Sequence, residues 1–539
     1  MRPNPSPASA DYVVVGGGSA GAAVARRLAD AGADVLLLEA GGRNTSSLVR
    51  MPGMVGVMHG VPAAQRTVTW GPSTTPQADA AGRQISQMHG RGLGGGSAVN
   101  AMIFARGHRT DYDAWAADGC PGWSHAEVLP AFRRLETFED GASQHRGGSG
   151  PVGVARAKDL QPVTEAFLDA LAATAGVAHN DDYNGAEQEG VSASQWNAVG
   201  GRRQSSGQTY LDHTPGRLRV VTGAHVTGIT LRGGTASGVE VATRRGTRRI
   251  EARREVVLSA GSFRTAQLLM LSGIGPAAHL REHAIRVVAD LPVGDNLQDH
   301  AVLPMVHRVR SGRVLTASGF LTTAVRERVR PGTTYLAGSF IEGIAHIRTP
   351  LAGAVPDLQV FATPLARRGD DPTVPGVHPG VEGPSLTLFA VLLRPESRGT
   401  VRLASRDPLA EPLIDPRYLS EPGDVDVLAA GVDLLRDAMA DPHVAPEVLG
   451  ELAPGPSASS RDAVREDVRR RISSVYHPVG TCRMGSDERS VVDPRLRVHG
   501  VAGLRVVDAS VIPTIPGGNT NAPAMMIAER AADLMLEDA

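Results

Sequence analysis

The sequence predicts an α/β fold, α+β over the whole chain, with a parallel sheet and further strands in the middle of the chain. Three observations predict it. First, the β-branched run Asp11–Val15 leads into a glycine-rich turn and then into a run of helix formers. Second, another apolar run follows and ends in an acidic residue. Third, alternating apolar segments such as Ser385–Leu393 occur in the middle of the chain. Since 539 residues exceed the roughly 100–200 of one domain, two joined domains are expected.

The first predicted element is a βαβ unit. Asp11–Val15 forms a buried strand that runs into Gly16-Gly-Gly-Ser-Ala-Gly21, a G-x-G-x-x-G turn. Ala22–Ala31 is rich in helix formers, and Asp34–Leu38 is a second buried strand that ends in Glu39. Strand, turn, helix, strand and acid in this order predict a Rossmann-like dinucleotide-binding unit.

Each part of this unit has a chemical reason. Gly16 allows the tight turn, Gly18 lets the backbone approach a pyrophosphate, and Gly21 lets helix and strand pack closely. The N-terminus of the helix then faces the phosphates. Glu39 stands where a carboxylate accepts hydrogen bonds from the adenosine ribose, and its charge repels the 2′-phosphate of NADP. The unit alone does not distinguish NAD from FAD.

Charge and cysteine content exclude several classes of protein. Lys+Arg number 55 against 56 Asp+Glu, so the net charge of -1 gives no electrostatic reason to expect nucleic acid or an anionic membrane as partner. The basic stretch Thr243–Ile250 lacks stacking aromatics and is interpreted as a solvated hairpin. Cys120 and Cys482 form no Cys-x-x-Cys motif, and Cys482 is interpreted as structural.

The termini and apolar segments predict a soluble, cytoplasmic protein. The first ten residues are polar and Pro-rich, which is not typical of a signal peptide. The longest apolar stretch, Val13–Ala25, is interrupted by glycines and is no membrane span. Recognisable metal-ligand spacings are missing from the sequence, so a bound organic cofactor is expected to supply the chemistry.

Two further glycine-rich motifs indicate a family. Gly90–Gly107 crowds glycines into a turn before an apolar stretch, which lets backbone lie against a flat ligand, and Gly261–Gly275 follows downstream. The two motifs closely resemble the signatures of the GMC (glucose-methanol-choline) oxidoreductases, flavoproteins that use FAD. One position departs from the pattern, because Ala266 stands where Pro or Ser is usual.

The resemblance extends over nearly the whole chain and is most like the choline dehydrogenase and the aryl-alcohol or hydroxymethylfurfural oxidase branches. The further motifs that carry it are Asp111–Trp115, Gly122-Trp123, Gly150–Val152, Asn184–Ala186, Gly294–His300, Arg394–Gly399, Ile414–Tyr418, Tyr476–Gly485, Val507–Val511 and Pro516–Pro523.

By this resemblance His477 is the active-site histidine and Asn519 fills the second catalytic position, where some members carry His and others Asn. Both are expected in front of the flavin N5 atom. Hydride loss from an alcohol carbon gives a carbonyl only if the hydroxyl proton also leaves, and imidazole, with a free pKa of about 6.5, suits the role of base. Asn519 can orient the alcohol oxygen without competing for protons.

FAD is expected to be bound noncovalently, because Val99 stands where members with covalent FAD carry a histidine. His89 lies on the other side of the turn. Asp508 resembles an acid near the ribityl chain, and Val226 resembles a position whose backbone contacts adenine. The expected FAD-binding residues are Gly16, Gly18, Ser19, Ala20, Gly21, Glu39, Ala40, Trp70, Arg91, Leu93, Gly95, Asn100, Ala101, Met102, Val226, Asp508, Ala509, Asn519 and Thr520.

Flavin motifs at both ends of the chain predict a discontinuous FAD-binding domain, residues 1–160, 205–300 and 465–539, whose last helix starts near Ala524. Residues 161–204 and 301–464 resemble the substrate domain of the family, an antiparallel sheet over the flavin. The loop richest in Pro and Ser is Glu451–Arg461. The protein is expected to be a monomer or a homodimer.

The leading functional hypothesis is oxidation of a primary alcohol to the aldehyde, with O2 or another acceptor reoxidising the flavin. The alternatives are a lyase of the same fold that resembles hydroxynitrile lyase, a choline dehydrogenase proper, and a non-enzymatic FAD-binding protein. Choline requires a carboxylate or an aromatic cage for its cation. Since aromatic residues make up only 4% of the chain, a neutral aliphatic or aryl alcohol is favoured.

Overall fold

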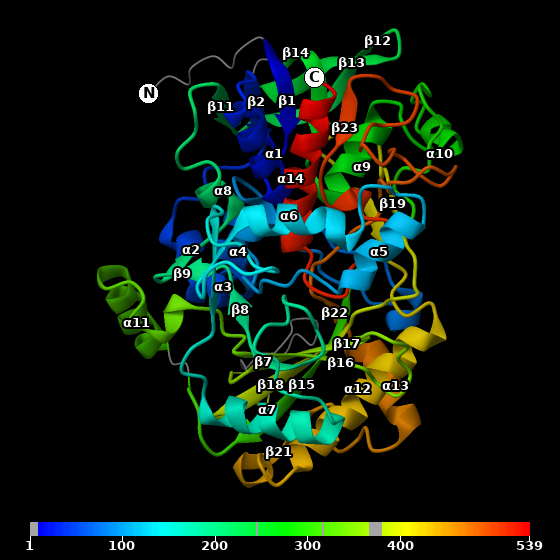
Figure 1. The fold of residues 1–539 in the computed structure, drawn as a ribbon. Coiled ribbons are helices and arrows are strands. Elements are labelled where there is room, and N and C mark those ends of the chain that lie inside the picture. The colour runs from blue at the N-terminus through cyan, green and yellow to red at the C-terminus, as the bar shows by residue number, and fades with distance from the viewer. Residues whose placement is uncertain (1–8, 244–245, 315–316, 366–379) are drawn as a thin grey trace.

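Two seven-stranded sheets at opposite ends of the molecule organise the fold (Figure 1). The computed structural model describes residues 9–243, 246–314, 317–365 and 380–539. The C-terminus lies at the end of the molecule that holds the first sheet (Figure 1). The predicted mixed α/β architecture, one sheet mainly parallel and the other antiparallel, is confirmed.

The first sheet contains the predicted βαβ unit at its centre. Its strand order is β11-β2-β1-β14-β13-β12, and β23 also pairs with β14. The strands around β1 are parallel, and only the β12–β13–β14 meander is antiparallel. The bounds are β1 Ser9–Val15, β2 Val35–Glu39, β11 Leu218–Thr222, β12 His225–Arg232, β13 Thr235–Thr243, β14 Gly246–Leu258 and β23 Leu504–Val506.

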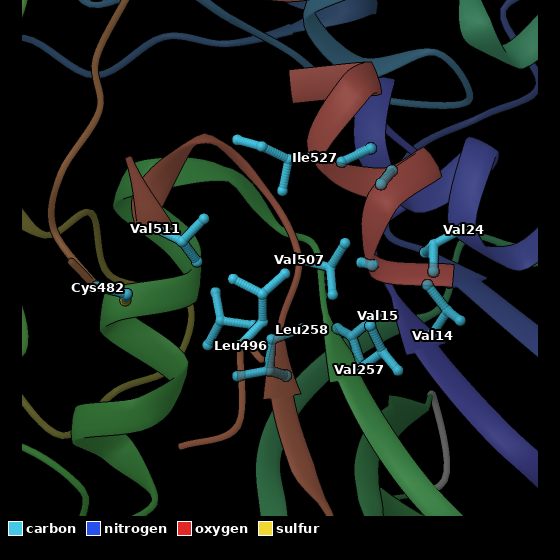
Figure 2. Packing of buried hydrophobic residues seen from close by; sticks show 14 of the residues in the cluster. Val14, Val15, Val24, Val257, Leu258, Cys482, Leu496, Val507, Val511 and Ile527 are labelled. Carbon is cyan, nitrogen blue, oxygen red and sulfur yellow. The ribbon is translucent and has the colours of Figure 1, made fainter. Parts of the chain in front are cut away.

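Small and β-branched residues allow helices to pack closely against this sheet. Helices α1 (Ser19–Asp30) and α14 (Asn521–Glu537) pack against each other, and α1 turns a face of buried alanines inward, which allows a close approach. Cys482 lies in the same core, where burial raises the pKa of its thiol (Figure 2). Residues far apart in sequence meet there: Val14, Val15, Val24, Val257, Leu258, Leu496, Val507, Val511 and Ile527 (Figure 2).

Two predicted boundaries are wrong by a few residues. Helix α14 begins at Asn521 rather than near Ala524, because Pro523 fits the first turn, where its missing N–H is not needed. The predicted loop Glu451–Arg461 begins later, since β21 (Val448–Ala453) pairs with a strand of the second sheet.

The basic stretch predicted as a hairpin connects β13 and β14, which pair from Thr243 and Gly246 onward. Residues 244–245 lie outside the described residues. Arg249 and Glu240 form an exposed ion pair across this hairpin.

The second sheet is antiparallel, with strand order β21-β15-β18-β17-β16-β7, and β22 also pairs with β15. Helices α7 (Pro162–Ala175), α12 (Pro422–Ala440) and α13 (Arg461–Arg471) pack against it and against one another. Strand β7 joins residues 161–204 to this sheet. The domain boundaries predicted above stay a prediction. The remaining strands are β7 Gly190–Ala193, β15 Ala301–Val309, β16 Gly343–Ile347, β17 Leu358–Thr363, β18 Ser385–Leu392 and β22 Ser473–Ser474.

Shorter elements complete the site region: α3 (Val55–Gly60), α4 (Pro62–Val68), β3 (Thr69–Trp70), β4 (His89–Gly90), α9 (Gly261–Leu271) and α11 (Ala317–Val329). Within the part of the chain that the structure describes, no helix has the length and apolar character needed to cross a lipid bilayer.

Two buried histidines of the second sheet make the stability of the fold depend on pH. Burial lowers the pKa of His346 to about 3 and that of His307 to about 4. Between these values and about 6.5 the unfolded chain binds protons that the folded chain does not. The free energy of unfolding should therefore fall as the pH drops below about 6.5, by up to about 1.4 kcal/mol per pH unit for each histidine.

Removing one of these histidines should reduce that slope. In His346→Met the loss of stability between pH 6.5 and 5 should be smaller than in the wild type by roughly one proton's contribution. Urea midpoints at several pH values measure it. His213→Met is the control, because His213 is exposed. An unchanged slope in His346→Met would show that His346 does not titrate as inferred.

Candidate functional site

A cavity of about 1300 Å³ is lined by residues of both sheets and holds most of the residues predicted to form the site. The predicted residues that line it are Gly16, Gly18, Ser19, Ala20, Glu39, Ala40, Trp70, Gly95, Asn100, Ala101, Met102, Val226, His477, Asp508, Ala509, Asn519 and Thr520. Three predicted residues do not line the cavity: Gly21, Arg91 and Leu93.

The first glycine-rich turn packs as its sequence predicts. Gly16 has φ = 101°, a left-handed conformation that favours glycine. A side chain at Gly21 would overlap the carbonyl oxygen of Gly16 and touch Ser259, so Gly21 provides the close contact between α1 and the sheet. The turn and the first residues of α1 thus bring backbone N–H groups to the cavity, where a pyrophosphate can bind.

The second glycine-rich turn lies directly against the first. A Cβ atom on Gly95 would come within 2.7 Å of the Gly18 Cα atom. The backbone N–H of Gly94 donates to the carbonyl of Gly17 at 2.8 Å. Leu93 is buried behind this contact. Two backbone segments that carry no side chain therefore meet at one wall of the cavity.

Glu39 holds the two turns together. Its carboxylate accepts hydrogen bonds from the backbone N–H groups of Gly17 (2.8 Å), Gly41 (2.7 Å) and Gly92 (3.0 Å). These three bonds leave at least one of about four lone-pair sites for another donor. The carboxylate predicted to bind a ribose is thus also the link between the first and second turns.

One end of the cavity is flat and aromatic. The guanidinium carbons of Arg91 and Arg264 each lie 4.6 Å from the ring centre of Trp70. His89 pairs with Trp70 across β3 and β4, and its ring lies 4.5 Å from that of Phe263. His89 therefore belongs to this end of the cavity, and Val226 on β12 lines it too.

Asp508 fixes the start of helix α9. Its Oδ2 atom accepts from the Gly261 N–H at 2.9 Å and from the Thr265 hydroxyl at 2.6 Å, while Oδ1 accepts from the Ser510 N–H at 2.8 Å. The Asp508 carboxylate thus accepts its hydrogen bonds from other protein groups, although Asp508 lines the cavity.

His477 and Asn519, predicted as a catalytic pair, are in contact. The Asn519 Nδ2 atom lies 3.1 Å from His477 Nε2. The backbone N–H of His477 donates to Asp299 Oδ1 at 2.8 Å, and the other oxygen of Asp299 accepts from Ser474 Oγ at 2.5 Å. Tyr418 also donates its hydroxyl to Asp299. The buried Asp299 carboxylate therefore holds the backbone segment that carries His477.

A second histidine lies behind His477. The Nδ1 atoms of His300 and His477 are 3.0 Å apart, and His300 Nε2 lies 3.1 Å from the carbonyl oxygen of Leu393. Because a carbonyl only accepts, His300 Nε2 carries a proton and donates it to Leu393. Burial lowers the pKa of His300 well below its usual value, so His300 is neutral and its Nδ1 atom is an acceptor.

The protonation of His477 follows from this chain of bonds. Only an N–H at His477 Nδ1 can donate to the bare Nδ1 of His300. Burial lowers the pKa of His477 to about 3, so the ring is neutral and Nε2 carries no proton. The amide of Asn519 must then point its NH2 group at Nε2. The result is an unprotonated nitrogen of His477 at the cavity.

Reasoning from the sequence did not identify three residues of the site. Asp299 and His300 stand in the Gly294–His300 motif, whose residue pattern alone does not indicate a role for either. Asn521 was not singled out: its Oδ1 accepts from Ser19 Oγ at 2.7 Å, while its buried Nδ2 finds no partner among the described residues. The buried Oδ1 atom of Asn519 is likewise unpartnered within that part of the chain. Both asparagines line the cavity.

Two family models described as GMC oxidoreductase match residues 10–302 and 395–528. An alcohol dehydrogenase [acceptor] of Pseudomonas putida is 37% identical over 98% of this chain and 95% of its own length. An oxygen-dependent choline dehydrogenase of Brucella ovis has the same identity and coverage.

Solved structures agree. The pyridoxine 4-oxidase from Mesorbium loti has a TM-score of 0.87 at 29% identity, covering 98% of this chain and 99% of that one. A fungal aryl-alcohol oxidase has a TM-score of 0.82 at 27% identity, covering 99% of both chains. Because the two family models together match most of the chain and relatives at 37% identity cover nearly all of it, this protein belongs to the GMC oxidoreductase family.

Proposed function

We propose that this oxidoreductase binds FAD noncovalently and oxidises a primary alcohol to the aldehyde, with His477 as the base. The observation that carries the proposal is the chain of contacts from the Leu393 carbonyl through His300 and His477 to Asn519, which leaves Nε2 of His477 unprotonated at a cavity whose other parts suit a dinucleotide. The names of the relatives support an alcohol as the substrate.

The residues of the cavity fit FAD. The touching glycine turns leave space for a pyrophosphate, Glu39 keeps capacity for a ribose hydroxyl, and Trp70 and Val226 line the part of the cavity proposed for adenine. The Nδ2 atom of Asn521 is a buried donor that has no acceptor among the described residues, which is costly unless a ligand supplies one. FAD, when bound, supplies an acceptor for the hydride that leaves the alcohol carbon.

The protein's own residues handle the proton. In the proposed reaction the alcohol O–H replaces the Asn519 N–H as donor to His477 Nε2 and passes its proton there. Asn519 then donates to the alcohol oxygen and orients it. His300 keeps its hydrogen bond to the Nδ1–H of His477, which also stabilises the imidazolium that forms.

The oxidant is proposed as O2 or another acceptor, since relatives of both kinds are named: an alcohol dehydrogenase [acceptor], an oxygen-dependent choline dehydrogenase and oxidases. The two cysteines are buried and free, which is compatible with the proposed cytoplasmic location.

Replacement of His477 tests the proposed base. His477→Ala should lower the rate of flavin reduction by a primary alcohol by about 10²-fold or more, because a general base contributes about 10²–10⁴. Anaerobic bleaching of the flavin measures it, and the flavin spectrum shows that FAD stays bound. His213→Ala, an exposed histidine, is the control. Unchanged bleaching in His477→Ala would remove His477 from the reaction; cyanohydrin cleavage without any bleaching by alcohols would indicate a lyase.

Replacement of His300 tests the arrangement behind the base. His300→Leu removes the acceptor for the Nδ1–H of His477 and should lower kcat about 10- to 100-fold with little change in KM. His300→Asn places an amide oxygen near the former Nδ1 position and should recover a large part of kcat. Steady-state kinetics of both variants measure this. Equal activity of the Leu and Asn variants would assign His300 a packing role only.

The mode of FAD attachment has its own test. Val99, at the position where a linking histidine would stand, has no nucleophilic atom, and His89 lies beside Phe263 and Trp70. Acid precipitation of the holoenzyme should leave all yellow colour in the supernatant. Colour that stays with the precipitated protein would contradict noncovalent binding.

A further inference from the structure

The end of the cavity that receives the substrate has apolar and aromatic walls. This substrate end is the part lined by the second sheet, by α3 and α4 and by α11. Four of the nine phenylalanines line it, namely Phe320 on α11, Phe340, Phe361 on β17 and Phe389 on β18. Valines and a leucine add to these walls. Burial of apolar surface against such walls favours an apolar substrate.

The described carboxylates that line the cavity already have hydrogen-bond or ion-pair partners in the protein. Among the described residues that line it, the acids are Glu39, Glu411 and Asp508. Glu39 and Asp508 accept hydrogen bonds from the backbone of the glycine turns and of α9. Glu411 pairs at 2.5 Å with Arg264, which stacks on Trp70 at the opposite end. The described lining of the substrate end thus offers no carboxylate to a cation.

The substrate end carries a positive charge instead. Arg313 lines the cavity, and its guanidinium lies 4.3 Å from the ring centre of Tyr335. The nearest carboxylate oxygen is Glu342 Oε1, 4.0 Å from Arg313 Nη1. The other oxygen of Glu342 accepts from the backbone N–H of Gln161 and the hydroxyl of Thr164. Arg313 and Glu342 therefore form a long ion pair, which balances the charge of Arg313 only in part.

From these walls and this charge we infer that the substrate is an uncharged, apolar alcohol and that Arg313 makes the cavity reject quaternary ammonium alcohols such as choline. The inference rests on the proposed function and narrows its substrate class. It separates this chain from the choline dehydrogenases to which it is 37% identical.

The phenylalanines alone do not decide the charge of the substrate. Aromatic faces attract cations as well as apolar groups, and a ring of them is a known receptor for quaternary ammonium. The sign of the remaining charge decides, because like charges that are only partly exposed to water repel each other. Arg313 supplies a positive charge there, and no described lining residue of the substrate end supplies a negative one.

A pair of alcohols of equal shape tests the inference directly. In 3,3-dimethylbutan-1-ol a carbon atom replaces the nitrogen of choline, so the two molecules differ in charge alone. With the wild-type holoenzyme under anaerobic conditions, the neutral alcohol should bleach the flavin with a second-order rate constant at least 100-fold above that of choline. Lengthening a linear alcohol should raise this constant about fourfold per CH2 group while the chain stays within the cavity.

The variant Arg313→Gln tests whether Arg313 causes the preference for a neutral alcohol. The preference for the neutral alcohol over choline should fall about tenfold in this variant, whereas Arg330→Gln, an exposed arginine at the end of α11, should keep it. Binding gives a readout apart from turnover: calorimetry with the His477→Ala holoenzyme should show a Kd at least tenfold lower for 3,3-dimethylbutan-1-ol than for choline. The flavin spectrum and melting temperature show that each variant is folded.

The outcomes separate this inference from the proposed function. Equal or faster bleaching by choline, or tighter binding of choline, would overturn the inference and leave alcohol oxidation intact. A preference that is unchanged in Arg313→Gln would remove Arg313 as its cause. Failure of every alcohol to bleach the flavin would overturn the proposed function itself.

Discussion

The hydrogen bond between the Nδ1 atoms of His300 and His477 decides which nitrogen of His477 faces the cavity. It is directional because His300 is locked by the carbonyl of Leu393. Were His300 turned or charged, the Nδ1 of His477 would lose its acceptor, and its Nε2 would no longer be held as the free base. Orientation of the Asn519 amide depends on the same bond, because Asn519 can donate only to an unprotonated Nε2.

The two sheets bring these residues together. β15 and β22 pair through Ala301 with Ser474, and the backbone N–H of Val475 donates to the carbonyl of His300. His300 and His477 therefore flank one short strand pairing of the second sheet. Asn519 comes from the other side, just before α14, whose buried face packs on α1 of the first sheet. The proposed catalytic pair thus spans the junction of the two sheets, and a shift between the sheets would separate its members.

Local patterns were enough to predict much of this arrangement. The βαβ unit follows from β-branched runs and three glycines, and His477 with Asn519 follows from motifs a few residues long. Contacts between distant segments could not be predicted in the same way. Glu39 binds three backbone N–H groups, one of them from Gly92, because two turns separated in sequence lie in contact. His300 gains its role from the carbonyl of Leu393, and Arg313 and the phenylalanines share one cavity only after the second sheet has formed.

The state of the His477 ring is the central claim, and nitrogen NMR measures it directly. The holoenzyme is labelled with 15N-histidine, and His477→Asn identifies the signals of His477 by their loss. At pH 7 the ring is expected to show one protonated nitrogen, assigned to Nδ1, and one bare nitrogen, Nε2, with no change down to pH 5, because burial holds the pKa of His477 near 3. A proton on Nε2, or an imidazolium ring at pH 6, would contradict the account.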